Sequence, residues 1–312
     1  MRGIAKGADP GLHGGTEDAM TDLRGTLAGM FEVGQHPLTF QGSVPRGGGI
    51  HDLSFTTAAG APVRGILCRP DAPSPLPVVL NLHAHGNRYE IGANELTDGR
   101  AALQAPLGPV LMAMGIASVC LDMPCFGARS GAGESAAAKA ALWEGRSLAG
   151  QMIGESVSAL DWIAAQDWVD PSRIGVFGMS MGATLGYWLA AVDGRVRALV
   201  QVCCLADFRG LIAAGGHDLH GIYLTVPGLL RVAGNGEIAG LVAPRAQLIC
   251  IGDLDPLTPE AAVEVALRAV RAGYARGGRL VVHREPLSGH VETAAMRAAA
   301  LAFLRDELIR SG

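Results

Sequence analysis

The chain alternates short apolar runs, rich in β-branched residues, with longer segments of helical periodicity. The runs from 77–83 onward are short and apolar, so we expect strands that are buried on both faces. Strands are predicted at 51–57, 63–69, 77–83, 116–122, 173–179, 197–204, 246–252 and 279–285, and helices at 98–114, 144–166, 181–192, 259–275 and 291–310. This alternation predicts an α/β fold in which a mostly parallel central sheet of about eight strands carries helices on both faces.

The alternation also divides the chain. Residues 1–49 begin with a polar, Gly-rich stretch and predict a partly flexible N-terminal arm, whereas residues 50–312 predict one domain. The strands at 51–57 and 63–69 flank a short turn and predict an antiparallel pair. Residues 205–245 interrupt the alternation. Because long structureless connections are uncommon in compact domains, we expect this segment to form a short cap-like insertion or pocket wall.

Composition narrows the class of protein. The chain is 49% hydrophobic and 17% charged, which suits a large buried core and is the opposite of a disordered composition. Net charge is −4 and no Lys/Arg run occurs, so we expect neither a nucleic-acid nor a membrane partner. No apolar h-region marks a secretory signal at the N-terminus. The six cysteines form no C-x-x-C pair and predict buried, reduced thiols in a cytoplasmic protein.

A G-x-S-x-G motif, Gly178 to Gly182, joins the predicted strand at 173–179 to the predicted helix at 181–192. On a sharp strand-to-helix turn, a serine hydroxyl projects above the sheet, and the residues two before and two after it must lack bulk. The motif therefore predicts Ser180 as a nucleophile. The alternative is a glycine-rich turn that packs a helix close to a strand, with Ser180 as its cap.

A nucleophilic serine needs a base, and the base needs an orienting acid. In this topology the acid and then the base should follow later strands. His290 follows the last predicted strand and is the predicted base, unless it is a capping or surface histidine. Asp255 is the predicted acid because it lies further out on a loop that two prolines stiffen. Asp253, directly after its strand, and Asp207 are the alternatives.

The stretch "LHAHGN" places His83 and His85 one residue apart at the end of a strand. Alternate residues of a strand share a face, so the pair could present two imidazoles to a metal. Zinc hydrolysis needs a third protein ligand and an open position, and Asn87 and Arg88 stand where further ligands would be expected. We therefore predict a turn, with no metal and no other cofactor.

The chain from about residue 50 resembles the α/β-hydrolase superfamily, and within it dienelactone-hydrolase-like and acetyl-xylan-esterase-like serine esterases. The resemblance rests on "LHAHGN", "LDMPCFGARS", "DWVDPSRIGVFGMSMGA", "APRAQLICIGDLDPLTP" and "SGHVE". It implies that the backbone N–H groups of His85 and Met181 stabilise the oxyanion. Ala84 stands where the family usually has glycine, so Gly86 is the neighbouring alternative donor. The family's namesake uses a cysteine nucleophile, whereas this chain has Ser180.

Further residues near the predicted site have structural interpretations. Asp122 ends a strand and is expected to hold the following loop, around Gly127, by backbone hydrogen bonds. Cys125 on that loop is expected to border the pocket without reacting. In the insertion, His217, His220 and Tyr223 are candidates for substrate contact, with surface polarity as the alternative.

Together these features predict a serine hydrolase that cleaves small-molecule carboxylic esters through a Ser180–His290–Asp255 triad and an acyl-enzyme. The insertion is too short for a large lid, so short acyl groups are expected. The same triad would serve a peptidase, a thioesterase or an acyltransferase, because fold and triad do not separate these reactions. A non-catalytic binding protein on this scaffold is a further alternative. A homodimer is compatible with the sequence.

Overall fold

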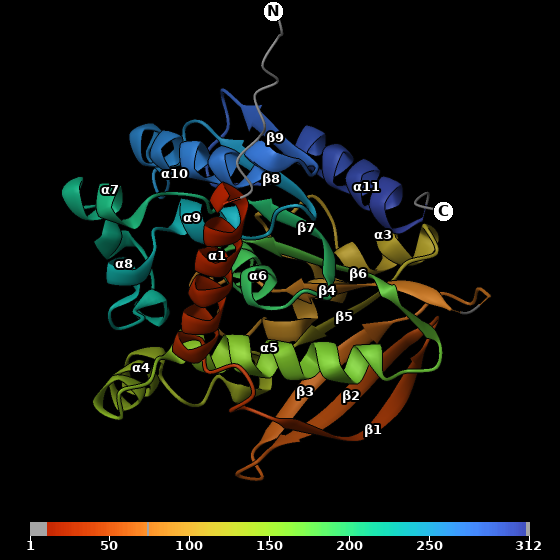
Figure 1. Ribbon diagram of the computed structural model, residues 1–312. Coiled ribbons are helices and arrows are strands. Elements are labelled where there is room, and N and C mark those ends of the chain that lie inside the picture. The colour runs from red at the N-terminus through yellow and green to blue at the C-terminus, as the bar shows by residue number, and fades with distance from the viewer. Residues whose placement is uncertain (1–10, 74, 310–312) are drawn as a thin grey trace, which may run out of the picture.

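The computed structural model describes residues 11–73 and 75–309, which form a nine-stranded sheet with helices on both faces (Figure 1). The strand order is β1-β2-β3-β5-β4-β6-β7-β8-β9. From β5 to β9 neighbouring strands are parallel, and the pairs from β1 to β5 are antiparallel. The strands are β1 (Leu38–Gly47), β2 (Ile50–Thr57), β3 (Pro62–Cys68), β4 (Leu76–Leu82), β5 (Ala117–Leu121), β6 (Val169–Met179), β7 (Val196–Val202), β8 (Ala246–Gly252) and β9 (Leu280–Glu285). The predicted α/β class is confirmed.

Two apolar clusters fill the space between the sheet and its two helical layers. One cluster takes side chains from α1 (Gly11–Met30), α5 (Leu148–Ala164), α6 (Met181–Val192), α9 (Asn235–Gly240) and α10 (Glu260–Gly273). The other takes them from α2 (Glu95–Asp98), α3 (Leu107–Ala113) and α11 (Ala294–Leu308). The central strands β4, β5 and β8 are buried at every position, as expected of strands covered on both faces.

The sheet begins earlier than the sequence analysis placed it. β1 lies within the segment predicted as an N-terminal arm, pairs with β2 along its length and adds a ninth strand. Most of its residues are exposed, so it lacks the apolar run by which the other strands were found. Phe40 supplies its contact with the core by packing on Phe55 and Trp162. Residues 1–10 of the predicted arm lie outside the described residues.

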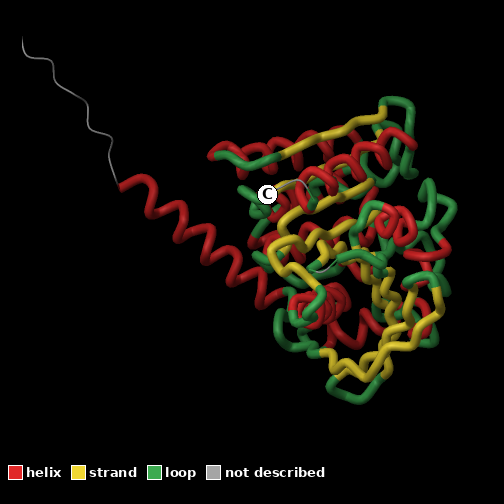
Figure 2. Tube along the Cα trace, turned by 90° about the vertical axis from the view of Figure 1, so that its right-hand side faces the viewer, coloured by secondary structure: helices red, strands yellow, loops and turns green. Residues whose placement is uncertain are grey.

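Helix α1 also falls within the predicted arm. Figure 2 shows that the helix begins away from the body of the domain and ends against it. The attached end is anchored by Leu27 and by Phe31, which follows the helix; both are fully buried. The ring of Phe31 stacks on Trp188 of α6 with centroids 5.0 Å apart. Arg24 donates a 2.7 Å hydrogen bond to the carbonyl of Ala191. The C-terminal part of α1 is therefore part of the packed domain.

The predicted insertion consists of short helical pieces. These are α7 (Phe208–Ala213), the 3₁₀ turns η3 (Gly216–Leu219) and η4 (Ile222–Leu224), α8 (Leu229–Val232) and α9. Phe208 packs edge-on against Trp188, which joins the insertion to the helical layer of α6. On the other side, η4 lies against α4 (Glu134–Trp143), a helix that the sequence analysis did not predict.

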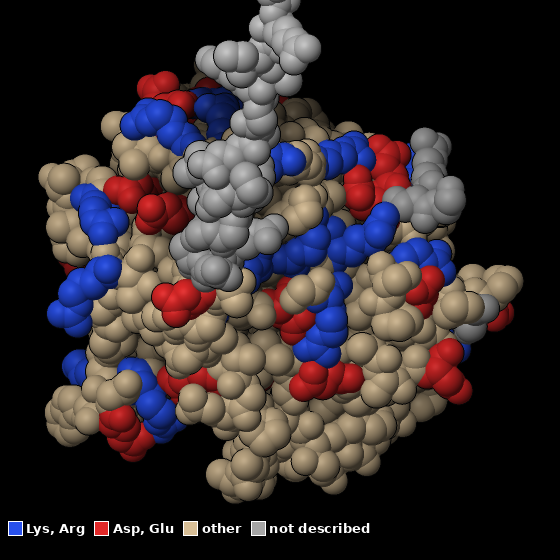
Figure 3. All heavy atoms as spheres, viewed as in Figure 1, with Lys and Arg blue, Asp and Glu red and all other residues tan. Residues whose placement is uncertain are grey.

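The charges on the surface are mixed, as expected from nearly equal numbers of basic and acidic residues in the sequence. Figure 3 shows Lys and Arg side chains interspersed with Asp and Glu over the face that carries α1 and α5. Arg195, for example, pairs with both Asp161 and Asp193. In residues 11–73 and 75–309, no helix has the length and apolar character that crossing a membrane requires.

The anchoring of the N-terminal segment can be tested through stability. Phe31→Ala should lower the free energy of unfolding by about 3–5 kcal/mol, because it leaves a cavity against Trp188. Trp143→Ala is the control, because Trp143 is 89% exposed and its loss should change stability by less than about 0.5 kcal/mol. Urea unfolding followed by circular dichroism measures both. Equal, small effects would show that this segment is not part of the cooperative core.

Candidate active site

The turn between β6 and α6 has the geometry that the G-x-S-x-G motif predicts. Ser180 has φ 55° and ψ −118°, a conformation that a residue with a side chain rarely adopts. Tight packing imposes it: a Cβ on Gly178 would lie 2.2 Å from the backbone of Gly182, and one on Gly182 would lie 1.8 Å from the carbonyl oxygen of Leu82. The two glycines therefore have no room for side chains, as predicted.

Three predicted side chains meet above the carboxyl ends of the strands. The Nε2 atom of His290 lies 2.9 Å from Oγ of Ser180, and Nδ1 lies 2.7 Å from Oδ2 of Asp255. Asp255 is buried, and its Oδ1 accepts a 2.9 Å hydrogen bond from the N–H of Leu257. The carboxylate can accept the Nδ1 proton of His290, which leaves Nε2 with a lone pair facing the serine hydroxyl.

The two alternative acids are engaged elsewhere. Asp253 forms a 2.8 Å ion pair with Arg284 on β9. Asp207 is the N-cap of α7 and accepts a 2.8 Å hydrogen bond from the N–H of Gly210. Among the three aspartates considered from the sequence, Asp255 is the one that the structure places against His290.

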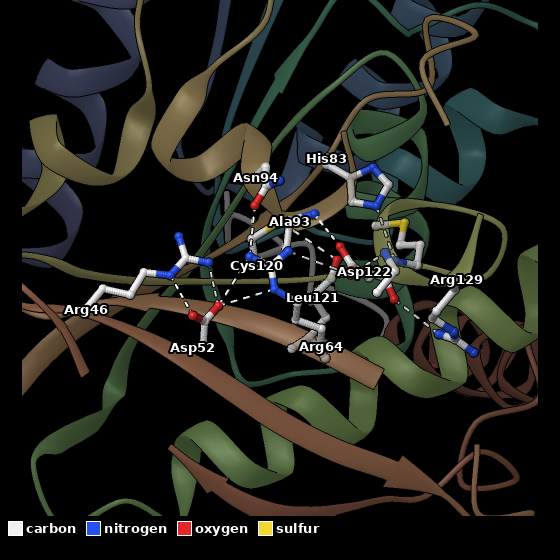
Figure 4. Close-up of polar contacts among 12 residues, drawn as sticks. Arg46, Asp52, Arg64, His83, Ala93, Asn94, Cys120, Leu121, Asp122 and Arg129 are labelled. Carbon is white, nitrogen blue, oxygen red and sulfur yellow. Dashed lines mark hydrogen bonds and ion pairs between the residues drawn. The ribbon is translucent and has the colours of Figure 1, made fainter. Parts of the chain in front are cut away.

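The turn after β4 carries His83 and His85. His83 is fully buried, with Nδ1 3.2 Å from the carbonyl of Ala84 and Nε2 accepting a 3.2 Å hydrogen bond from the N–H of Met123 (Figure 4). Burial lowers the pKa of His83 to about 3, so the ring is neutral. Because each ring nitrogen already faces a backbone group, His83 is a structural residue of the turn.

Asp122 performs the role predicted for it. Its carboxylate accepts hydrogen bonds from the N–H groups of Ala93, at 2.7 Å, and Ala128, at 2.9 Å (Figure 4). Its backbone carbonyl accepts a further bond from Arg129. Asp122 therefore holds the loop around Gly127 against the chain that follows the His83–His85 turn. Cys125 on that loop is buried, and burial raises the pKa of its thiol, which disfavours the reactive thiolate.

A buried ion pair holds the His83–His85 turn from one side. The carboxylate of Glu95 accepts a 2.9 Å hydrogen bond from the N–H of Ala84 and lies 2.5 Å from Arg100. Arg100 in turn donates to the carbonyl oxygens of Ala84, at 2.8 Å, and His85, at 3.2 Å. Both side chains are buried, so the pair fixes the carbonyl groups of the turn.

Glu134 at the start of α4 holds the same turn from the other side, and the sequence analysis missed it. Its Oε2 accepts hydrogen bonds from Nε2 of His85, at 2.8 Å, and from the hydroxyl of Tyr89, at 2.6 Å. Its Oε1 accepts a 3.0 Å bond from the N–H of Tyr223 in the insertion. Nδ1 of His85 accepts a hydrogen bond from the N–H of Asn87, which assigns the ring proton to Nε2.

The charge of Glu134 follows from these contacts. Burial alone would raise the pKa of its carboxyl, but the hydrogen bonds from His85 and Tyr89 outweigh burial and lower it. The hydrogen bond to Glu134 also raises the pKa of Tyr89 to about 12. Glu134 is therefore an anion at neutral pH, surrounded by donors. No motif marks this glutamate, because its partners lie in two segments, residues 85–89 and residue 223, that are far from it in the sequence.

The three candidates for substrate contact are placed differently. His217 and His220 line a cavity of about 460 Å³ within residues 208–230, which we call the insertion cavity. Nε2 of His220 donates a 3.0 Å hydrogen bond to the carbonyl of Leu257, two residues from Asp255. Tyr223 is buried instead, and its ring stacks on His85 with centroids 5.4 Å apart. Its ring packs against the His83–His85 turn and is not available for contact with a substrate.

The sheet order, the strained serine on a strand-to-helix turn and the helices on both faces define an α/β-hydrolase. The chain belongs to the X-Pro dipeptidyl-peptidase (S15) family, whose model matches residues 62–232. It is 38% identical over 237 residues to the putative hydrolase YtaP of Bacillus subtilis (strain 168), an alignment covering 75% of this chain and 79% of YtaP. The protein is therefore a hydrolase.

Solved structures show the same fold. The acetyl xylan esterase from Paenibacillus sp. R4 has a TM-score of 0.67 at 20% identity, covering 93% of this chain and 95% of that one. An acetyl xylan esterase from Thermoanaerobacterium sp. JW/SL YS485 has a TM-score of 0.61 at 18% identity, covering 92% and 93%. The predicted α/β-hydrolase fold is confirmed along nearly the whole chain.

The metal alternative for His83 and His85 can be tested directly. Because the structure engages the ring nitrogens of both residues with protein groups, prolonged treatment with a chelator should leave hydrolysis unchanged. Elemental analysis of the purified protein should show less than stoichiometric zinc. Activity that is lost on chelation and restored by one added metal would reinstate a metal site.

Proposed function

We propose that the protein hydrolyses carboxylic esters through Ser180, His290 and Asp255. The observation that carries this proposal is the continuous hydrogen-bond chain from Ser180 Oγ through both nitrogens of His290 to the buried Asp255 carboxylate. A neutral imidazole between a hydroxyl and a buried carboxylate can take up the hydroxyl proton and be stabilised as it becomes charged. No metal or organic cofactor is needed for this chemistry.

The reaction has two halves. Oγ of Ser180 attacks the ester carbonyl carbon while its proton moves to Nε2 of His290. The tetrahedral intermediate collapses when the bond to the alcohol oxygen breaks and His290 gives the proton to that oxygen. Water then attacks the acyl-enzyme, again losing a proton to His290. The acid leaves as Ser180 regains its proton. Asp255 keeps the ring proton on Nδ1 throughout and stabilises the imidazolium.

The developing oxyanion needs hydrogen-bond donors. We assign the backbone N–H of Met181, the first residue of α6, and that of His85 in the turn after β4. The helix N-terminus adds a favourable partial positive charge at Met181. A single donor of this kind is worth roughly 3–4 kcal/mol of barrier. Glu95, Arg100 and Glu134 hold the His85 turn rigidly, and a rigid donor costs no reorganisation during the reaction.

Short acyl groups suit this site best. Aromatic rings crowd the oxyanion turn: Tyr89, Phe126 and Tyr223 have centroids 5.2, 5.2 and 5.4 Å from that of His85. The acyl carbon must lie beside the oxyanion donors, next to a turn that these rings hold rigid. A chain that clashes with a rigid wall loses more than burial of its methylenes gains. We therefore propose acetyl to butyryl esters as substrates.

The family match favours a second candidate, an X-Pro dipeptidyl-peptidase. Such an enzyme would use the same triad on an amide and would need an anion for the free amino group of its peptide. Asp218 on the wall of the insertion cavity could supply that anion. The ester and peptide candidates therefore share their chemistry and differ in the group bound beside the triad.

One substrate panel separates these candidates. Activity on p-nitrophenyl acetate and butyrate should far exceed that on the palmitate ester and on glycyl-prolyl-p-nitroanilide. Ser180→Ala should abolish hydrolysis and covalent labelling by a fluorophosphonate with little change in melting temperature. A higher kcat/KM for the anilide than for the esters would support the peptidase candidate instead. Labelling that persists in Ser180→Ala would refute the nucleophile.

The acid can be tested by a matched pair of substitutions. Asp255→Asn should lower kcat by about three orders of magnitude or more, because an amide at this position no longer fixes the His290 tautomer. Asp253→Asn removes only the ion pair to Arg284 and should change kcat less than about threefold. Steady-state kinetics on p-nitrophenyl acetate measures both. The reverse ranking would transfer the role of acid to Asp253.

Glu134 should act on the rate through the oxyanion turn. Glu134→Gln keeps the volume but sets an amide N–H against the donors that the carboxylate accepts, so the His85 turn should shift. We expect kcat to fall about 10- to 100-fold with KM nearly unchanged, somewhat less than complete loss of one oxyanion donor costs.

The control for this substitution is Glu144→Gln, at an exposed position two residues from its partner Arg146. It should leave both kinetic constants unchanged. A purely structural role for Glu134 would instead appear as a lower melting temperature with normal kcat at a temperature where the variant is folded.

A further inference from the structure

The insertion cavity is mostly apolar and has the size of a small-molecule site. Its volume of about 460 Å³ falls in the range typical of ligand pockets. Apolar side chains from three helical pieces line it, including Phe208, Leu211, Ile222 and Leu229. Leu211 and Leu229 are buried and form its floor, whereas Thr225 on its rim is exposed. An apolar hollow of this kind gains by taking up an apolar group of a ligand.

His220 connects the wall of the cavity to the loop that carries Asp255. Its Nε2 donates to the carbonyl of Leu257, and the N–H of Leu257 donates to Oδ1 of Asp255. Two hydrogen bonds therefore connect the cavity wall to the acid of the triad. Burial lowers the pKa of His220, so this side chain is uncharged at neutral pH. Asp218, which also lines the cavity, is exposed, so the buried part of the lining suits an apolar group.

The reaction chemistry decides which part of an ester would enter the cavity. The alcohol oxygen must lie within hydrogen-bond reach of Nε2 of His290, because this atom returns the proton when the ester bond breaks. The alcohol therefore departs on the His290 side, to which His220 links the cavity through Leu257 and Asp255. The acyl carbon instead lies beside the proposed oxyanion donors, at the His85 turn with its packed aromatic rings.

We infer that the insertion cavity binds the apolar part of the alcohol, so that the preferred substrates are short-acyl esters of alkyl or aryl alcohols. This inference rests on the proposed esterase function and adds the substrate class on its leaving-group side. It predicts that kcat/KM rises as an apolar alcohol lengthens and falls as the acid lengthens.

A series of n-alkyl acetates from methyl to hexyl tests this inference, because all release primary alcohols of closely similar basicity. We expect kcat/KM to rise about fourfold per methylene, the equivalent of about 0.8 kcal/mol for each buried CH₂. A glycol-ether acetate of the same chain length as the hexyl ester should lose most of this gain. The matching series of methyl alkanoates, in which the acid lengthens, should fall beyond butyrate.

Variants locate the effect in the cavity. Thr225→Trp fills the cavity from its exposed rim and should reduce kcat/KM for hexyl acetate at least tenfold while methyl acetate is unaffected. Thr39→Trp is the matched control, because Thr39 is exposed on the edge strand β1 and should affect neither ester. Ile222→Ala enlarges the cavity and should shift the optimum toward longer alcohols.

The outcomes distinguish this inference from the proposed function. If methyl acetate is hydrolysed in a Ser180-dependent manner but kcat/KM is flat along the alcohol series, or if Thr225→Trp affects methyl and hexyl acetate equally, the inference is wrong and the esterase proposal stands. If kcat/KM instead rises as the acid lengthens, and Thr225→Trp abolishes that rise, the cavity binds the acyl group. If none of the esters is hydrolysed, the proposed function itself fails.

Discussion

The close approach of Gly182 to the carbonyl of Leu82 organises the whole site. That contact leaves no room for a Cβ atom, and it presses the first turn of α6 against the end of β4. Ser180, the proposed nucleophile, directly precedes α6, and the His83–His85 turn begins directly after β4. This backbone contact between α6 and the end of β4 therefore brings the serine and both proposed oxyanion donors to the same edge of the sheet.

Around this contact, burial decides which groups are charged. His83 is buried and His220 is half-buried, and burial lowers the pKa of both rings, so they are neutral and serve as hydrogen-bonding groups. Glu134 is also buried but is surrounded by three donors, which keep its carboxylate ionised. In the triad, Asp255 is covered by protein while the side chain of His290 is 24% exposed. The proposed base is therefore accessible from solvent, and the proposed acid is shielded from water.

Much of this could be predicted from local sequence patterns. The strands from β2 to β9 follow from short runs rich in β-branched residues, and Ser180, Asp255 and His290 follow from a motif and from the ends of successive strands. β1 escaped prediction because an exposed edge strand has no apolar run. Glu134 was not predicted, because its role depends on tertiary contacts with residues 85, 89 and 223, which no local sequence pattern indicates. The insertion could be located by its length, but its cavity arises from packing between short helices that a sequence does not reveal.

Glu134 contacts the insertion through a backbone group, so substitutions in the insertion need not break this contact. Oε1 of Glu134 accepts its hydrogen bond from the backbone N–H at position 223, a group that every amino acid except proline supplies. The insertion can therefore accept new side chains along its cavity while the support of the oxyanion turn stays in place. Substrate preference and catalytic geometry are separable in this architecture, so altered leaving-group selectivity is accessible by substitutions in the insertion without rebuilding the triad.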